Sequence, residues 1–232
     1  MTKIVLIIFL TIINLHAISG EKELREVIKK TYPELTIKSI QKTNYNDLYE
    51  IFIGGQIIYS DEDFNFLIVE GRLVDPKTKI DLTSARLEDL NKVDFDSLPF
   101  KNAIKEERGD GSRRIAVFSD VDCPFCRKLE KETISKLKDV TIYTFLYPLA
   151  IHPDAMNKSK KIWCSGNKTI AWKNYMLKNA LPKNDGNCDT PIEENLELAK
   201  ELGISSTPTI IVSNGKRIEG ALPYEDIVKY IE

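Results

Sequence analysis

The chain has 232 residues, which is enough for one or two domains with a sizeable core. Its 33 basic and 35 acidic residues give a formal net charge of −2. Neither this balance nor any basic run with interleaved aromatic residues indicates nucleic acid or an anionic membrane surface as a partner.

The first 19 residues have the pattern of a secretory signal peptide. Lys3 gives a positive start, residues 4–13 are almost wholly apolar, and Ala17-Ile18-Ser19 offers small residues for cleavage. The alternative is an N-terminal membrane anchor, but the apolar run is short for spanning a bilayer. No cysteine follows the run to carry a lipid. We therefore expect residues 1–19 to be cleaved and the protein to be exported.

Residues 20–80 are expected to form one helix and a small antiparallel sheet. The helix is predicted over residues 21–32 and ends at Pro33. Its apolar face is expected to consist of Leu24, Val27, Ile28 and Tyr32. Gly54-Gly55 indicates a hairpin turn. The expected strands are Ile37–Ile40, Leu48–Ile53, Gln56–Tyr59, Phe64–Val69 and Gly71–Val74.

So small a unit buries little apolar area by itself. We therefore expect residues 20–80 to be a dimerisation domain that pairs with a second copy. The runs Leu48–Ile53 and Phe64–Val69 are the candidate edges for this pairing.

A linker helix and hinge are expected over residues 81–107. Thr83 or Ser84 is the predicted cap, and Leu98-Pro99 is expected to end the helix. Its apolar stripe is expected to consist of Leu87, Leu90 and Val93. The alternative is an ordinary helix within one continuous domain.

Residues 108–232 have the order of elements typical of a thioredoxin fold with a helical insert over about residues 150–202. A strand that enters a helix through Cys-Pro-x-Cys is typical of the opening βαβ unit of that fold. The last helix is expected over Tyr224–Ile231. The expected strands are Arg114–Ser119, Val140–Leu146, Thr207–Val212 and Arg217–Glu219. The predicted fold class is therefore α+β.

The segment Cys123-Pro124-Phe125-Cys126 is predicted to be a redox-active thiol pair. Exchange needs a thiolate, and the N-terminus of a helix favours negative charge there. In such sites the pKa of the attacking cysteine falls to about 3.5–7.5. Pro124 suits the first helical position, and Cys126 points to the same side. We assign Cys123 as the attacking thiol and Cys126 as the resolving thiol.

Charged residues of both signs flank this pair. Arg127 and Lys128 favour the thiolate, whereas Asp120 and Asp122 oppose it, and the sequence leaves the balance open. A zinc half-site and a structural disulfide are the alternatives for the pair. Zinc needs four N or S ligands, and His152 is the one histidine after residue 19. We therefore expect no metal and no cofactor, and we interpret His152 as a loop residue.

Two further features support exchange chemistry. Thr207-Pro208 opens a late strand, where a cis bond beside the cysteine pair would leave backbone groups for an extended substrate. The alternative is a trans proline at a strand start. Cys164 and Cys188 have no partner at redox spacing, and we expect a structural disulfide across the insert, the alternative being two free buried thiols.

The chain resembles the bacterial DsbC/DsbG family of periplasmic disulfide isomerases. The resemblance covers nearly all the residues after the signal peptide. It is most specific in the segments 117–126, 162–164 and 203–209. It implies a homodimer built through a small, cystatin-like N-terminal domain, with Cys164–Cys188 as a structural bridge and Thr207 and cis-Pro208 flanking the active site.

The resemblance also implies a function. The protein is expected to isomerise or reduce non-native disulfides in unfolded or misoxidised secreted proteins, with chaperone-like binding, and to be kept reduced by a membrane thiol reductase of the DsbD type. The Pro124-Phe125 dipeptide differs from the Gly-Tyr of the best-known isomerases and the Pro-Tyr of DsbG. A DsbA-like oxidase and a periplasmic holdase therefore stay as alternatives.

Overall fold

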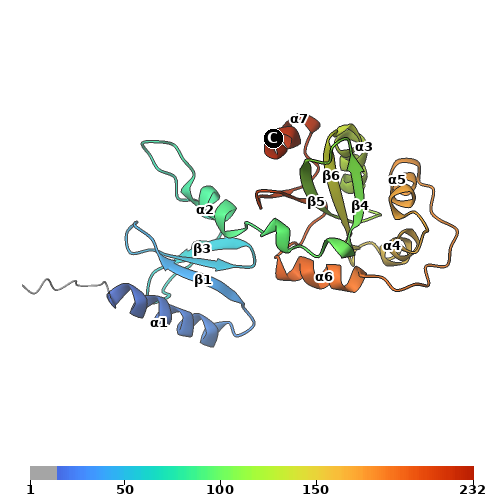
Figure 1. Cartoon of the computed structure of the whole chain (residues 1–232). Helices are drawn as coiled ribbons and strands as arrows, with labels where there is room; N and C mark the ends of the chain where they lie inside the picture. Colours follow the sequence, from blue (N-terminus) through green and yellow to red (C-terminus); the bar gives the residue numbers. More distant parts are fainter. Residues whose placement is uncertain (1–14) are drawn as a thin grey trace, which may run out of the picture. The chain divides into compact units, whose positions relative to one another are not determined.

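The computed structural model describes residues 15–232, with side chains from Gly20 onward (Figure 1). The chain folds as two compact units that divide between Leu87 and Glu88. The predicted signal peptide, residues 1–19, lies largely outside the described residues. Within the described range, no helix is both long enough and apolar enough to cross a membrane.

The N-terminal unit consists of one helix on a three-stranded antiparallel sheet. The helix α1 spans Leu15–Thr31, and the sheet has the order β1 (Ile37–Lys42), β2 (Tyr49–Ile53) and β3 (Gln56–Ser60). Its core is formed by Leu24, Ile28, Ile40, Tyr49 and Ile51. The predicted helix face is wrong at Val27 and Tyr32, which are 40% and 39% exposed.

Two strand predictions in this unit are also wrong. The segments 64–69 and 71–74 form only the isolated bridges Tyr59–Ile68 and Val74–Asp81. Positive φ angles at Phe64 (59°) and Glu70 (58°) interrupt the extended backbone that a strand needs. The expectation that 48–53 is a pairing edge is wrong as well, because β2 is the central strand and bonds to both neighbours.

The second helix, α2, spans Leu82–Leu90, and its cap differs from the prediction. The Asp81 carboxylate accepts from the Ser84 N–H at 2.8 Å. The predicted cap Thr83 is buried instead, and its hydroxyl bonds to the Tyr59 hydroxyl at 2.6 Å. The helix ends at Leu90 rather than before Leu98, and two short 3₁₀ turns follow at Phe95–Ser97 and Phe100–Asn102.

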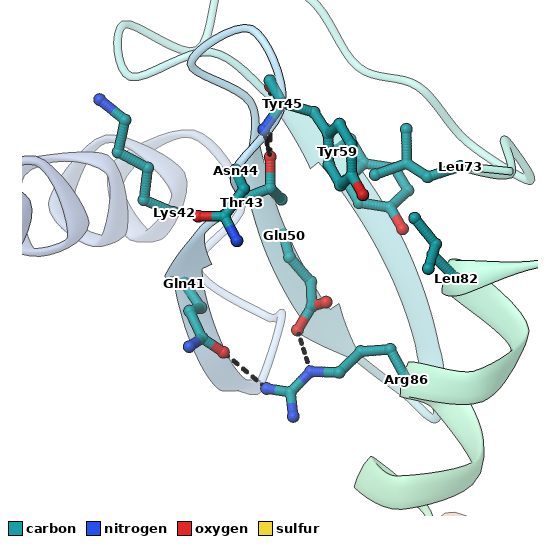
Figure 2. Close-up of a pocket in the computed structure, with 10 residues that line it drawn as sticks. All are labelled: Gln41, Lys42, Thr43, Asn44, Tyr45, Glu50, Tyr59, Leu73, Leu82 and Arg86. Carbon is teal, nitrogen blue, oxygen red and sulfur yellow. Dashed lines mark hydrogen bonds and ion pairs between the residues drawn. The ribbon is translucent and has the colours of Figure 1, made fainter. Parts of the chain in front are cut away.

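A polar pocket lies in the N-terminal unit between the sheet and α2 (Figure 2). The Arg86 guanidinium donates to Glu50 at 3.0 Å and to the Gln41 side chain at 2.6 Å. Glu50 is only 8% exposed, so Arg86 supplies the counter-charge that burial of a carboxylate requires. This contact fixes α2 against β1 and β2.

The C-terminal unit contains a five-stranded sheet of order β4-β6-β5-β7-β8. Its strands are β4 (Ile104–Arg108), β5 (Arg113–Ser119), β6 (Val140–Leu146), β7 (Thr209–Val212) and β8 (Arg217–Glu219). β5 and β6 are parallel, and the other neighbours are antiparallel. β4 was not predicted, because a largely charged edge strand carries little apolar pattern.

Helices cover both faces of this sheet. They are α3 (Pro124–Glu132), α4 (Ala155–Trp163), α5 (Lys168–Lys178), α6 (Ile192–Glu201) and α7 (Tyr224–Ile231). Alternate residues of β5 point to opposite faces: Ile115 packs with Leu129 of α3 and Ile227 of α7, whereas Phe118 packs with Ala199 of α6. The predicted thioredoxin-like architecture with a helical insert is confirmed.

Candidate active site

The cysteine pair lies where the central strand β5 meets the helix α3. β5 ends at Ser119, and Cys123 is the residue immediately before the helix, with an extended backbone (φ −70°, ψ 121°). Pro124 occupies the first turn, where a missing N–H costs no helical hydrogen bond. Both cysteines are free thiols, and Cys123 and Cys126 are 5% and 1% exposed. The predicted strand-to-helix junction is confirmed.

Cys123 is set up to ionise. The hydrogen bond from the Cys126 thiol is the main reason that the pKa of Cys123 falls from its usual 9.0 to about 5. Burial acts in the opposite direction, and the Thr207 side chain and the backbone N–H groups of Cys126 and Phe125 favour the thiolate. At neutral pH the Cys123 sulfur is therefore mainly in the nucleophilic thiolate form.

Thr207 contacts the same sulfur from the other side. The Cys123 thiol donates to the Thr207 carbonyl at 3.4 Å. The Thr207 hydroxyl is buried and has no hydrogen-bond partner among the described residues, and a hydroxyl can rotate to donate to an anion. The Cys123 thiol thus donates to the Thr207 carbonyl, whereas the Cys123 thiolate can accept a hydrogen bond from the Thr207 hydroxyl. The bond between Thr207 and Pro208 is cis.

Cys126 has the opposite character. Burial raises the pKa of its thiol far above its usual range, and donation to the Cys123 sulfur raises it further. The Asp120 N–H donates to the Cys126 sulfur at 3.4 Å. The pKa shifts thus favour an ionised Cys123 sulfur beside a protonated Cys126 sulfur.

Both acidic residues before the pair have basic partners. Asp122 accepts from Lys158 at 2.8 Å through each carboxylate oxygen and from the Tyr175 hydroxyl at 3.0 Å. Asp120 is fully buried and bonds to His152 Nδ1 at 2.9 Å. Two residues beyond the motif, His152 and Lys158, thus supply partners for the acidic residues whose influence the sequence left open. Their separation in sequence gave no signal of this pairing.

The two cations after Cys126 act less directly. The Arg127 guanidinium donates to the carbonyls of Tyr175 and Met176 at 3.1 and 3.4 Å and lies over the Tyr175 ring at 5.2 Å. It therefore joins α3 to α5. Lys128 is exposed. Phe125 is 62% exposed, so the dipeptide presents an aromatic side chain at the surface beside the nucleophile.

The insert is closed by a disulfide between Cys164 and Cys188, which are 24 residues apart in sequence. Cys164 follows the last residue of α4, and Cys188 precedes α6. The bridge therefore ties the loop after α5 back to the helix that supplies Lys158. Residues 15–232 hold no group of three or more metal-ligating side chains placed around a common point.

Comparisons with known proteins agree with this geometry. The family described as the disulfide bond isomerase protein N-terminal domain matches residues 16–84, and the thioredoxin-like domain family matches residues 100–232. A probable thiol:disulfide interchange protein DsbC of Bordetella parapertussis is 36% identical over 203 residues, which are 88% of this chain and 71% of that protein.

Two further relatives extend the likeness. The thiol:disulfide interchange protein DsbC of Escherichia coli is 25% identical, and the match covers 97% of this chain and 94% of that protein. The crystal structure of a disulfide interchange protein from Neisseria gonorrhoeae is 40% identical, with a TM-score of 0.55. That match covers 58% of this chain and 98% of the solved chain.

Proposed function

The chain belongs to the DsbC family of thiol:disulfide interchange proteins, and on that basis we propose that it isomerises non-native disulfides in exported proteins. The carrying observation is the contrast within the cysteine pair: the Cys123 thiol has its pKa lowered to about 5, whereas burial raises that of Cys126. The Cys123 sulfur is therefore available as a nucleophilic thiolate, whereas the Cys126 sulfur ionises with difficulty.

The proposed reaction begins when the Cys123 thiolate attacks one sulfur of a substrate disulfide. A bond forms between Cys123 and that sulfur, and the second substrate sulfur leaves as a thiolate. The freed thiolate can attack another substrate disulfide. A later substrate thiolate then attacks the sulfur bound to Cys123 and releases Cys123 as a thiolate. The substrate gains and loses no electrons in this cycle.

The second route is reduction. Cys126 loses its proton, attacks the Cys123 sulfur and expels the substrate sulfur, which takes up a proton. The substrate gains two electrons and the protein is left with a Cys123–Cys126 disulfide. Because Cys126 resists ionisation, its attack on the Cys123 sulfur is slowed, and the mixed disulfide has time to rearrange. A membrane thiol reductase of the DsbD type would return the oxidised pair to dithiol.

We propose that Thr207 and Pro208 bind the substrate backbone. When Cys123 ionises, it stops donating to the Thr207 carbonyl, which is then available to an N–H of an extended chain. The Pro208 carbonyl is already bonded to the Gly220 N–H at 2.8 Å. The backbone contribution therefore comes from Thr207, and the exposed Phe125 ring supplies an apolar contact.

The working form is proposed to be a homodimer in the periplasm. The N-terminal unit leaves several apolar side chains of one segment exposed, namely Phe66, Leu67, Ile68, Val69, Val74 and Ile80. A second copy that packs on this segment, which is bridged to β3 at Tyr59–Ile68, would cover them. Light scattering at micromolar concentration tests this: Val69→Asp should give monomers, whereas Leu35→Asp, at another exposed apolar site of the unit, should stay dimeric.

Refolding of a scrambled multi-disulfide substrate tests the enzymatic proposal. Cys123→Ala should abolish recovery of native activity. Cys126→Ala should retain part of the recovery and accumulate mixed disulfides, because rearrangement does not use Cys126. Full rescue by Cys123→Ala would eliminate the proposal and favour a holdase, whose suppression of aggregation should survive that substitution.

An oxidase is the second candidate, because a thiolate with a pKa of about 5 stabilises the reduced protein and makes the disulfide a better oxidant. The redox state of the cysteine pair in its native compartment separates the two. A mainly reduced pair supports the isomerase, and a mainly oxidised pair supports the oxidase.

A further inference from the structure

His152 lies in the loop between β6 and α4, and its ring contacts Asp120, three residues before Cys123. Its Nδ1 atom is 2.9 Å from Asp120 Oδ2. The same carboxylate accepts from the Leu149 N–H at 2.6 Å and from the Asp122 N–H at 2.7 Å. Asp120 is completely buried, and the His152 side chain is 22% exposed. The loop is therefore fastened to the residue that precedes the active site.

Asp120 also contacts both cysteines through its backbone. Its N–H donates to the Cys126 sulfur at 3.4 Å, and its carbonyl accepts from the Cys123 N–H at 3.3 Å. The backbone of Asp120 thus ties the residue that carries this buried carboxylate to both cysteines. An isolated buried carboxylate there would oppose a second anion. A protonated imidazole at 2.9 Å offsets that charge.

We propose that His152 is a positioning residue. When its imidazole is protonated and bonded to Asp120, it stabilises the Cys123 thiolate, so the stability of the thiolate depends on pH. The proposal rests on the proposed use of Cys123 as the attacking thiol. It goes beyond the thiol pair because it adds a titrating cation from a separate loop. It also predicts that oxidation of Cys123 and Cys126, which removes the Cys123 charge, lowers the pKa of His152.

The groups around His152 mostly favour its charged form. The titratable groups that act on it are Asp120 and Asp122 of the loop after β5 and Cys123 at the start of α3, and Asp154 and Lys158 at α4 are joined to this group through Asp122. Lys158 is engaged by Asp122 at 2.8 Å and by Asp154 at 3.4 Å. The hydrogen bond to Asp120 is the main reason that the pKa of His152 is raised, and the Cys123 thiolate adds to it.

The stability of the Cys123 thiolate is expected to fall as His152 loses its proton. Below its raised pKa, His152 is charged and neutralises Asp120. As pH rises through that value the cation is lost, and Cys123 faces an uncompensated carboxylate. Two substitutions separate the effect of the His152 charge from the effect of its hydrogen bond to Asp120. His152→Gln can keep a hydrogen bond to Asp120 without a charge, and His152→Lys keeps a cation that does not titrate near neutral pH.

The test is a thiolate titration by ultraviolet absorbance, together with NMR titration of the imidazole. His152 is the one histidine after residue 19, so its imidazole signal is simple to assign with the variants. His152→Gln should raise the ionisation midpoint of Cys123 by about half a pH unit, a roughly threefold loss of thiolate stability, and His152→Lys should restore it. The imidazole should titrate at higher pH in the dithiol form than in the disulfide form.

Equal Cys123 midpoints in the parent chain and His152→Gln would overturn the proposal, as would an imidazole that titrates identically in both redox states. A midpoint that rises in both variants would also reject it, because a structural loss would not be rescued by lysine. These equilibrium titrations need no substrate, so their failure is separate from failure of the isomerase assay.

Discussion

The buried carboxyl of Glu130 allows a quantitative prediction. Glu130 lies on α3, one helical turn after Cys126, and is 6% exposed. The Trp172 indole N–H donates to its Oε2 atom at 3.3 Å. Burial is the main reason that the pKa of Glu130 rises from its usual 4.5 to about 7. We therefore predict that Glu130→Gln stabilises the protein at alkaline pH.

The magnitude follows from linkage. Because the folded pKa lies above the unfolded one, the folded state binds the proton more tightly, and stability falls as pH rises between 4.5 and about 7. Each pKa unit is worth about 1.36 kcal/mol, so the full loss is about 3 kcal/mol. Glutamine has no charge to bury. The gain in unfolding free energy should be about 1 kcal/mol at pH 5 and about 3 kcal/mol at pH 8.

Urea unfolding of the full chain at the two pH values measures this difference. Glu132→Gln is the matched control, since it lies at the exposed end of the same helix and should change stability by less than about 0.5 kcal/mol at either pH. Cys123 titrates in the parent chain and in both variants, so its contribution to the pH dependence of the unfolding free energy cancels in the comparison. A gain that is equal at pH 5 and pH 8, or a loss of stability at pH 8, would refute the reasoning.

Three further outcomes are expected. Cys126→Ala should raise the ionisation midpoint of Cys123 by about one pH unit, because it removes the main donor to the thiolate; an unchanged absorbance titration would contradict this. Thr207→Val should raise the same midpoint by roughly half a unit, whereas Ser205→Ala, an exposed neighbour, should not. The double substitution Cys164→Ala with Cys188→Ala opens the crosslinked loop and should lower the unfolding free energy by about 3 kcal/mol; a urea midpoint equal to that of the parent would disprove this.

The sequence predicted the C-terminal unit well because its elements have strong local patterns. The buried strand Arg113–Ser119 is nearly all apolar after its first two residues, and Pro124 marks the helix start. The N-terminal unit was predicted less well. The apolar run Phe64–Val69 has strand composition, but the left-handed residues at its ends turn the backbone away from the sheet, and composition does not encode that turn.

The active site divides in the same way. Cys123, Cys126 and Pro208 were predicted as site residues from local sequence patterns, and the structure shows the helix start at Pro124 and the cis bond before Pro208. The pairing of Asp120 with His152 and of Asp122 with Lys158 depends on how the loop after β6 and the helix α4 fold back on the cysteine loop. These contacts join residues more than 30 positions apart, so only the tertiary structure reveals them.

The Cys164–Cys188 bridge has a consequence for the protein's own biogenesis. A newly made chain with four cysteines can pair them in three ways, and one of the four is the Cys123 sulfur, whose lowered pKa favours the thiolate. Cys188 is exposed, so the bond can be formed after the surrounding helices have assembled. For the proposed function, Cys164 and Cys188 must be oxidised while Cys123 and Cys126 stay reduced, so maturation of the protein would itself depend on thiol–disulfide exchange.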